Sequence, residues 1–410
     1  KRFSDGCVDF TGSHNGTEAL ADVMEDIAMQ SETAMGIVFG RRDDSGRNHS
    51  RTDCRTCPVP VFLRFRAENG IFGYHCQRPF ALLPADRYPQ WTYGHSWKCR
   101  TRSGRTIPST GRCTNHLHDF QNAGYKTGAF GKWGLGFIGS TGDPKKQGID
   151  EFYGYNCQLL AHSYYPDHLW DNDKRVELKD NTLDVQYGKG TYSQDLIHSK
   201  ALDFLDRMGK SGESFCMWYP TIIPHAELIV PEDSIIKKFR GKYPEKPFHG
   251  TEPGNPAFRK GGYCSQFYPH ATFAAMVYRL DVYVGQIVQK LKEMGVYDNT
   301  IIIFASDNGP HMEGGADPDF FNSNGIWRGY KRDLYEGGIR VPMIISWPGR
   351  VQPSTQTDFM CSFWDVMPTF REILNPKAKN QQMDGVSLLP CSKTAKGRKN
   401  MNICTLNFRR

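Results

Sequence analysis

The chain has 410 residues and a mass of 46.6 kDa, with 39% hydrophobic and 23% charged residues. This length excludes a small disulfide scaffold and suits one large α/β domain with an appendage, or two ordinary domains. No stretch approaches the roughly 20 consecutive apolar residues that a membrane span needs. The formal net charge of +7 comes from lysines and arginines that form no long block, so nucleic-acid binding gets little support while an anionic substrate remains open.

Two kinds of sequence occur along the chain. From about His118 to Pro390, apolar runs, amphipathic periods and turn residues follow one another as in an ordinary globular enzyme. Residues 40–66 and 96–117 are instead rich in Arg, Ser, Thr and Cys and show no periodicity, although they keep aromatics that disordered tails avoid. We therefore predict that residues 1–118 are corrupted or read in a shifted frame, that 119–390 form an intact core, and that 391–410 are the shifted start of a truncated C-terminal subdomain.

The intact core predicts a layered α/β domain. In chain order, the expected elements are a buried strand at residues 215–219, a long helix at 270–295, a strand at 301–305 and a strand at 341–347. The helix places Val277, Leu280, Val284, Ile287 and Leu291 on one apolar stripe, and each strand is a short β-rich apolar run. Reactive side chains in such domains commonly lie just beyond the carboxyl ends of the strands.

Three clusters of chemical interest lie along this predicted domain. Lys132 lies in a glycine-rich run, which lets the backbone pack closely and presents a cation to an anion. His225 follows a proline beyond the strand at 215–219. Asp307 and Asn308 emerge where the strand at 301–305 ends, and adjacent hard oxygen donors of this kind suit Ca²⁺ or Mg²⁺.

A fourth cluster surrounds Lys331, in a cation-rich run ahead of the last predicted strand. Each cluster also has a plain structural explanation, because Asp-Asn-Gly-Pro is a common turn composition, a lone histidine is more often structural and a lysine is often solvated. Taken singly the four clusters are weak. Their order and spacing are what make them informative.

The ordered set resembles the type I sulfatases, the arylsulfatase and carbohydrate-sulfatase family of the alkaline-phosphatase-like superfamily. The resemblance covers roughly residues 120–390 and is carried by FQNAGYKTGAFGKWGLG, AHSYYPDHLWDN, YPTIIPHAEL, NTIIIFASDNGPH, RGYKRDLYEGGIRVPMIISWPGR, FWDVMPTFREIL and DGVSLLP. It implies an α/β fold with a mixed central sheet flanked by helices on both faces. It also implies a calcium-dependent hydrolase of sulfate esters, with glycans as the expected substrates.

The resemblance assigns roles to individual residues. Lys132, His225 and Lys331 would contact the sulfate group or the leaving-group oxygen, and His162 would be an additional active-site histidine, with His168 close by as an alternative.

A single Ca²⁺ ion is also implied. Asp307 and Asn308 would be two of its ligands, and Asp43 with Asp44, which follow an apolar run, are candidates for the N-terminal pair of calcium-binding aspartates.

The physical chemistry of sulfate transfer agrees with these roles. A sulfate ester carries one negative charge that spreads over several oxygens as the S–O bond breaks, so lysines and a divalent cation in a dry pocket would stabilise the transition state. A histidine can protonate the departing alkoxide. Gly134 departs from the pattern, because many family members have a histidine there.

Family sulfatases also need a formylglycine nucleophile, made from the first residue of Cys/Ser-x-Pro-x-Arg. We expect this motif to be absent, since Cys76-Gln-Arg-Pro-Phe and Cys57-Pro-Val-Pro-Val both lack the arginine in place. Codons for residues 76–98 read one base later can spell V-S-A-P-S-R, which restores the motif in its serine form. The chain as written is therefore expected to be inactive.

Several alternatives remain open at this stage. A phosphoesterase or phosphonate hydrolase of the same superfamily would share the calcium ligands and lysines. A non-catalytic protein that binds sulfated glycans would keep the anion pocket. A zinc site at Cys54 and Cys57 is disfavoured, because the later cysteines lack paired spacing.

The expected partner is a sulfated small molecule or glycan and not a nucleic acid. No membrane span is expected in the chain. Tyr164, Tyr165 and Trp170 are either stacking residues for a sugar ring or core residues. Exported, glycan-degrading members of the family imply a periplasmic or secreted parent, although KRFSDGCVDF lacks the apolar core of a signal peptide.

Overall fold

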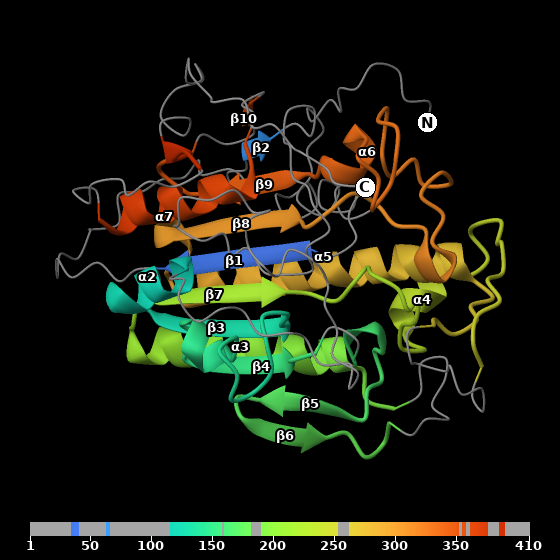
Figure 1. Cartoon of the computed structure of the whole chain (residues 1–410), viewed down its shortest axis with the longest axis horizontal. Coiled ribbons are helices and arrows are strands. Elements are labelled where there is room, and N and C mark those ends of the chain that lie inside the picture. The colour runs from blue at the N-terminus through green and yellow to red at the C-terminus, as the bar shows by residue number, and fades with distance from the viewer. Residues whose placement is uncertain are drawn as a thin grey trace.

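The computed structural model describes residues 34–40, 63–65, 115–157, 160–181, 190–252, 262–351, 355–357, 361–375 and 385–389. These residues form one mixed sheet of ten strands with helices on both faces (Figure 1). The predicted fold class is confirmed.

The directions of the strands decide where their ends meet. β3 pairs in parallel with β4 and β7, whereas β1 is antiparallel to both β7 and β8. β3, β4, β7 and β8 therefore run in one direction and end together, at what we call the carboxyl end of the sheet. We call the opposite end, where β8 begins, the amino end. From one side of the sheet to the other, the strands are β10 (Thr355–Thr357), β2 (Leu63–Phe65), β9 (Met343–Ser346), β8 (Thr300–Ser306), β1 (Ala34–Gly40), β7 (Phe215–Pro220), β3 (Lys126–Lys132), β4 (Glu151–Tyr155), β5 (His168–Asp171) and β6 (Lys174–Glu177).

Helices cover the two faces of the sheet. α3 (Ser193–Ser211) and α5 (Pro269–Glu293) pack together on one face, and α2 (His116–Asn122) packs against α7 (Val366–Leu374) on the other. α4 (Ser234–Phe239) packs on α5, while α6 (Glu336–Ile339) lies just ahead of β9. Short 3-10 helices occur at η3 (Pro144–Gln147), η4 (Leu160–His162), η5 (Tyr297–Asn299), η6 (Glu313–Gly315) and η7 (Phe363–Asp365).

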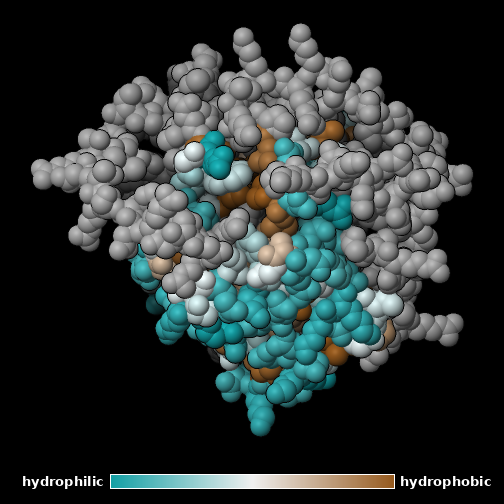
Figure 2. All heavy atoms as spheres, turned by 90° about the vertical axis from the view of Figure 1, so that its left-hand side faces the viewer, coloured by the Kyte–Doolittle hydropathy of each residue, from teal (hydrophilic) through white to brown (hydrophobic). Residues whose placement is uncertain are grey.

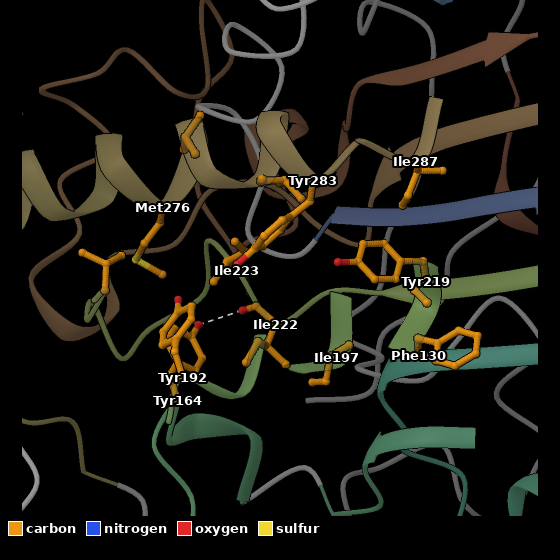
Figure 3. Packing of buried hydrophobic residues seen from close by; sticks show 14 of the residues in the cluster. Phe130, Tyr164, Tyr192, Ile197, Tyr219, Ile222, Ile223, Met276, Tyr283 and Ile287 are labelled. Atoms are coloured by element: carbon orange, nitrogen blue, oxygen red, sulfur yellow. Dashed lines mark hydrogen bonds between the residues drawn. The ribbon is translucent and has the colours of Figure 1, made fainter. Parts of the chain in front are cut away.

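β7 illustrates why these segments form a central sheet. Phe215, Met217 and Tyr219 pack into the cluster that contains α3 and α5, part of which is drawn in Figure 3. Cys216 and Trp218 pack into the other cluster, with α2 and α7. Because successive side chains of a strand point to opposite faces, a continuous apolar run is what burial on both faces requires. All six residues of β7 are buried, including the five at 215–219 that the sequence predicted as a core strand.

α5 and β9 differ from the prediction only at their ends. The predicted helix at 270–295 is α5, whose first turn is closed by Glu245, since its carboxylate accepts from the amides of His270 and Ala271 at 2.9 and 3.0 Å. The predicted strand at 341–347 is shorter, because Pro342 has no N–H to donate to the ladder and the Trp347 carbonyl accepts from the turn that follows.

The amino end of the sheet carries an apolar pocket beneath α7. Its lining includes Ile301 and Ile303 of β8, Trp347 just after β9, and Phe370 and Ile373 of α7. Figure 2 looks onto this end of the molecule, where hydrophobic residues gather in the upper middle above a largely hydrophilic surface. Among the helices that the structure describes, none has both the length and the apolar composition that a membrane crossing requires.

Candidate active site

Four predicted site residues lie at the end of, or after, strands that end at the carboxyl end of the sheet. Lys132 is the last residue of β3, and Asp307 directly follows β8. His162 is the last residue of η4, which comes after β4, and His225 lies in the segment after β7. Because these four strands point the same way, the topology delivers all four residues to one end of the sheet.

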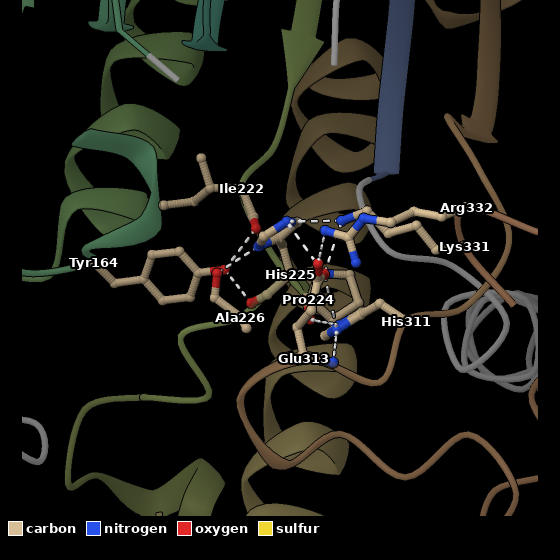
Figure 4. Close-up of polar contacts among 9 residues, drawn as sticks. All are labelled: Tyr164, Ile222, Pro224, His225, Ala226, His311, Glu313, Lys331 and Arg332. Carbon is tan, nitrogen blue, oxygen red and sulfur yellow. Dashed lines mark hydrogen bonds and ion pairs between the residues drawn. The ribbon is translucent and has the colours of Figure 1, made fainter. Parts of the chain in front are cut away.

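His225, Lys331 and Glu313 lie in direct contact at this end (Figure 4). Lys331 Nζ lies 3.2 Å from His225 Nε2 and donates to Glu313 Oε2 at 2.8 Å. Arg332 donates to the other oxygen of the same carboxylate. The side chains of His225 and Lys331 are only 3% and 1% exposed. The fold thus joins two predicted residues that lie 106 positions apart in the sequence.

Three imidazole rings stack at the site. The ring of His225 lies in the middle, 5.2 Å from that of His162 at an interplanar angle of 12° and 5.5 Å from that of His311 at 16°. His168, the alternative to His162, is instead the first residue of β5, where its Nδ1 lies 2.7 Å from Asp167. Geometry therefore favours His162 over His168 as the histidine next to His225.

Hydrogen bonds fix the orientation of the His225 ring. Its Nδ1 contacts the carbonyl oxygen of Ala226, which can only accept, so Nδ1 carries the proton. In the neutral ring Nε2 is then an acceptor, and it faces Lys331 Nζ. The Tyr164 hydroxyl holds the backbone of the segment that carries His225. It donates to the Ile222 carbonyl at 2.7 Å and also contacts the His225 carbonyl as a donor. Burial raises the pKa of Tyr164 well above its usual value, so the hydroxyl keeps its proton.

The turn after β8 is tied to the Lys331 segment through the backbone. The amide of Lys331 donates to the Pro310 carbonyl at 2.8 Å, and the Gly309 amide donates to the Gly338 carbonyl at 3.1 Å. A Cβ on Gly309 would lie 1.9 Å from the Gly337 carbonyl oxygen, so only glycine allows this approach. The turn that carries Asp307 and Asn308 is thereby fixed beside the cations.

Asp307 and Asn308 fit part of a calcium site. Asn308 is 4% exposed, and its buried Oδ1 has no hydrogen-bond partner among the described residues, as expected of an oxygen that serves a cation. No group of three or more His, Cys, Asp and Glu residues in the described part of the chain could hold a metal ion. Among the described residues, Asp307 and Asn308 therefore supply two hard oxygen donors, which make up only part of a calcium ligand set.

The second predicted pair of ligands, Asp43 and Asp44, lies outside the described residues, and its role stays a prediction. β1, the strand before it, runs antiparallel to β8, so that Gly40 pairs with Thr300 at the amino end of the sheet. Asp307, which belongs to the other predicted ligand pair, instead follows β8 at the carboxyl end of the sheet.

Lys132 is placed by close backbone packing. It pairs with Tyr155 of β4 in the sheet register and is 7% exposed. At Gly131 a Cβ would lie 1.9 Å from the Pro220 carbonyl oxygen, which is why the residue before Lys132 is a glycine with a φ of 140°. The glycine-rich run thus brings β3 against the end of β7, as the close-packing interpretation predicted.

Burial perturbs the charged groups of the site. Burial of its ammonium, together with the charge of Arg332, lowers the pKa of Lys331 to about 6, although the Glu313 carboxylate favours the charged form. Burial alone would raise the pKa of Glu313, but the charges of His225, His311 and Arg332 outweigh it and the net shift is down. Burial and the neighbouring His225 lower the pKa of His311 to about 4, against the pull of Glu313.

Sequence reasoning missed Glu313 and His311. His311 stood inside the segment NTIIIFASDNGPH but received no role, and Glu313 follows it two residues later. A His-x-Glu pattern directly after a predicted metal-binding turn was the available signal. Tyr164 and Tyr165 are 0% and 1% exposed in the core cluster with α3 and α5, so they are core residues and not a sugar-binding surface.

The expectation that Cys/Ser-x-Pro-x-Arg is absent was wrong as a statement about the sequence. Residues 346–350 read Ser-Trp-Pro-Gly-Arg. Ser346 is the last residue of β9, pairs with Ile302 near the start of β8 and is 1% exposed. It therefore lies at the amino end of the sheet, away from His225 and Lys331, and its position does not suit a nucleophile for this site. Cys57 and Cys76 lie outside the described residues.

The sequence matches a known family and its curated members. The family model described as Sulfatase matches residues 102–375, which is more than half of the chain. The chain is 30% identical over 294 residues to the uncharacterized sulfatase YdeN of Escherichia coli (strain K12), covering 66% of this chain and 45% of the relative. It is 27% identical over 281 residues to N-acetylgalactosamine-6-sulfatase of Homo sapiens, covering 66% and 46%. The chain thus spans about half the length of these curated relatives.

Solved structures show the same fold. The structure of Ps i-CgsB in complex with k-i-k-neocarrahexaose is similar with a TM-score of 0.61 at 24% sequence identity, and the match covers 82% of this chain and 69% of that chain. With the family match, this likeness leads to one assignment: the chain belongs to the Sulfatase family and has its alkaline-phosphatase-like fold.

Proposed function

We propose that the chain is part of a calcium-dependent hydrolase of sulfate esters carried by glycans. The buried contact between Lys331 and His225, beside the turn that bears Asp307, is the observation that carries this proposal. It joins a cation that can bind a sulfate oxygen to a ring that can pass a proton to a leaving oxygen. The names of the human relative and of the carrahexaose complex support a glycan as the carrier of the ester.

The residues of the site divide the chemistry among them. Lys331 and Lys132 would bind sulfate oxygens, and a bound anion would favour the charged form of Lys331 over the neutral form that burial favours. His225 would carry the transferable proton at Nε2 in its doubly protonated form, because its Nδ1 proton is engaged with the Ala226 carbonyl. His162, stacked on His225, would help to hold that ring in place.

Two groups that the family implies differ in how well they fit this chain. Ca²⁺ would be held by the Asp307 carboxylate and the Asn308 amide oxygen, and when bound it supplies a fixed positive charge for sulfate oxygens. The formylglycine does not fit, since Ser346, in the Ser-x-Pro-x-Arg sequence, lies at the amino end of the sheet. We therefore propose that the chain as written binds sulfate esters without turning them over. An exported location stays a prediction.

The test compares two proteins. Binding of 4-nitrophenyl sulfate is measured by calorimetry for the chain as written, and hydrolysis is measured for it and for the product of a gene whose codons 72–117 are restored to the family's frame. We expect binding without turnover in the first protein and turnover in the second. Absence of binding in both would contradict a sulfatase site. Faster hydrolysis of 4-nitrophenyl phosphate than of the sulfate by the restored protein would favour a phosphoesterase.

A further inference from the structure

Glu313 is a buried carboxylate surrounded by nitrogen atoms. Its side chain is 13% exposed, and its Oε2 lies 2.8 Å from Lys331 Nζ, 3.7 Å from His311 Nδ1 and 3.9 Å from His225 Nε2. Its Oε1 pairs with the guanidinium of Arg332, which is 54% exposed. Glu313 therefore contacts both the cation and the histidine to which the proposed function gives the sulfate and the leaving oxygen.

Local backbone geometry brings Glu313 to this place. It begins η6, where the next two residues, Gly314 and Gly315, have φ values of 65° and 96°. A Cβ on Gly314 would lie 2.8 Å from the Cβ of Ala226, the residue after His225. The two glycines thus let the turn pack directly against the His225 segment, and the Glu313 amide donates to His311 Nδ1 at 3.1 Å.

A carboxylate at this position opposes the binding of any anion. The direction of the Glu313 pKa shift, downward because of His225, His311 and Arg332 despite its burial, keeps the group ionised at neutral pH. With the histidine rings neutral and Lys331 kept charged by the bound anion, the three side chains of Lys331, Arg332 and Glu313 together carry a single net positive charge. A single positive charge complements a sulfate ester, which carries one negative charge, better than a phosphate monoester, which carries nearly two at neutral pH.

We propose that Glu313 is a specificity-determining residue, whose carboxylate beside Lys331, Arg332 and His225 disfavours doubly charged esters and so selects sulfate over phosphate monoesters. This inference rests on the proposed function. Two unit charges about 4 Å apart interact strongly at the effective dielectric constant of a partly buried site, so removal of the carboxylate is expected to change the relative affinity for the two esters by about 10- to 100-fold.

The experiment measures dissociation constants for 4-nitrophenyl sulfate and 4-nitrophenyl phosphate at about pH 7, by calorimetry on the full chain. Glu313→Gln removes the negative charge with little change of shape. Arg332→Gln removes a positive charge from the same pair on a half-exposed side chain, so it tests the opposite sign without a buried substitution. Glu336→Gln is the matched control, because Glu336 pairs with Arg340 in and just after α6 and the net charge changes equally.

Glu313→Gln should strengthen phosphate binding about tenfold or more relative to sulfate binding, and Arg332→Gln should shift this ratio in the opposite direction. The control should leave the ratio unchanged. Equal changes in affinity for both esters in Glu313→Gln would overturn the inference, and so would a shift of the affinity ratio in the same direction in Glu313→Gln and Arg332→Gln. If the wild-type chain still binds the sulfate, the proposed function stands in either case. A wild-type chain that binds neither ester would overturn both.

Discussion

The two ends of the central sheet differ in what they bury. At the carboxyl end, Lys331, Glu313 and His225 are charged or titratable groups in mutual contact inside the protein. At the amino end, Ile301, Trp347 and their neighbours line an apolar pocket beneath α7. Burying a charge costs free energy unless it is paired, so a cluster of buried charged groups indicates a functional site. The contrast teaches that a sequence motif can be assigned a role in the site only when the end of the sheet at which it lies is known.

The largest expected effect is at the carboxyl end. Lys331→Met should weaken binding of 4-nitrophenyl sulfate by about 100-fold or more, because it removes a buried cation that the proposed function assigns to a sulfate oxygen. Calorimetry measures this loss. Lys290→Met is the matched control, since Lys290 pairs with Asp206 on α3, away from the site. A change of less than about threefold in Lys331→Met would remove Lys331 from the anion site.

The next effect concerns calcium. With Ca²⁺ at about 100 times its dissociation constant, we expect the free energy of unfolding of the wild-type chain to rise by about 2.7 kcal/mol. Asp307→Asn should lose most of this gain, because a carboxylate ligand becomes a neutral amide. Thermal unfolding with and without Ca²⁺ measures the difference, and Asp319→Asn, at an exposed position that pairs with Tyr330, serves for comparison. A calcium effect that persists in Asp307→Asn would place the ion elsewhere.

A smaller effect is expected from pH. Since the pKa of Lys331 is lowered to about 6, its ammonium is fully charged only below that value and loses its charge as the pH rises through it. Affinity for the sulfate should therefore be highest at low pH and fall by up to about tenfold per pH unit, with a midpoint moved upward by the bound anion. Lys331→Arg should abolish this dependence, because arginine stays charged. An unchanged dependence in that variant would assign the titration to another group.

The smallest effect is expected at the amino end. Ser346→Ala should leave sulfate binding unchanged and lower the free energy of unfolding by no more than about 1 kcal/mol, because within the described part of the chain the Ser346 hydroxyl makes only a 3.4 Å contact, with Tyr297. Calorimetry and chemical denaturation measure the two quantities. Loss of binding in this variant would contradict the separation of the two ends, and it would reopen the Ser-x-Pro-x-Arg sequence as part of the site.

Sequence reasoning succeeded where a local pattern determines the structure. β8 and β7 follow from apolar runs, and Asp307 is found because it directly follows such a run. Glu313 was missed because its place depends on two consecutive glycines with positive φ and on packing against Ala226, which no periodicity reports. The antiparallel direction of β1 could not be read either, since an apolar strand carries no mark of its direction.

The close approach of Gly309 to the Gly337 carbonyl oxygen couples two parts of the site mechanically. Any side chain at position 309 would act as a wedge, pushing the oxygen donors after β8 away from the segment that carries Lys331. A substitution at this one position would then disturb cation coordination and anion recognition together, although the glycine itself would contact neither the cation nor the anion.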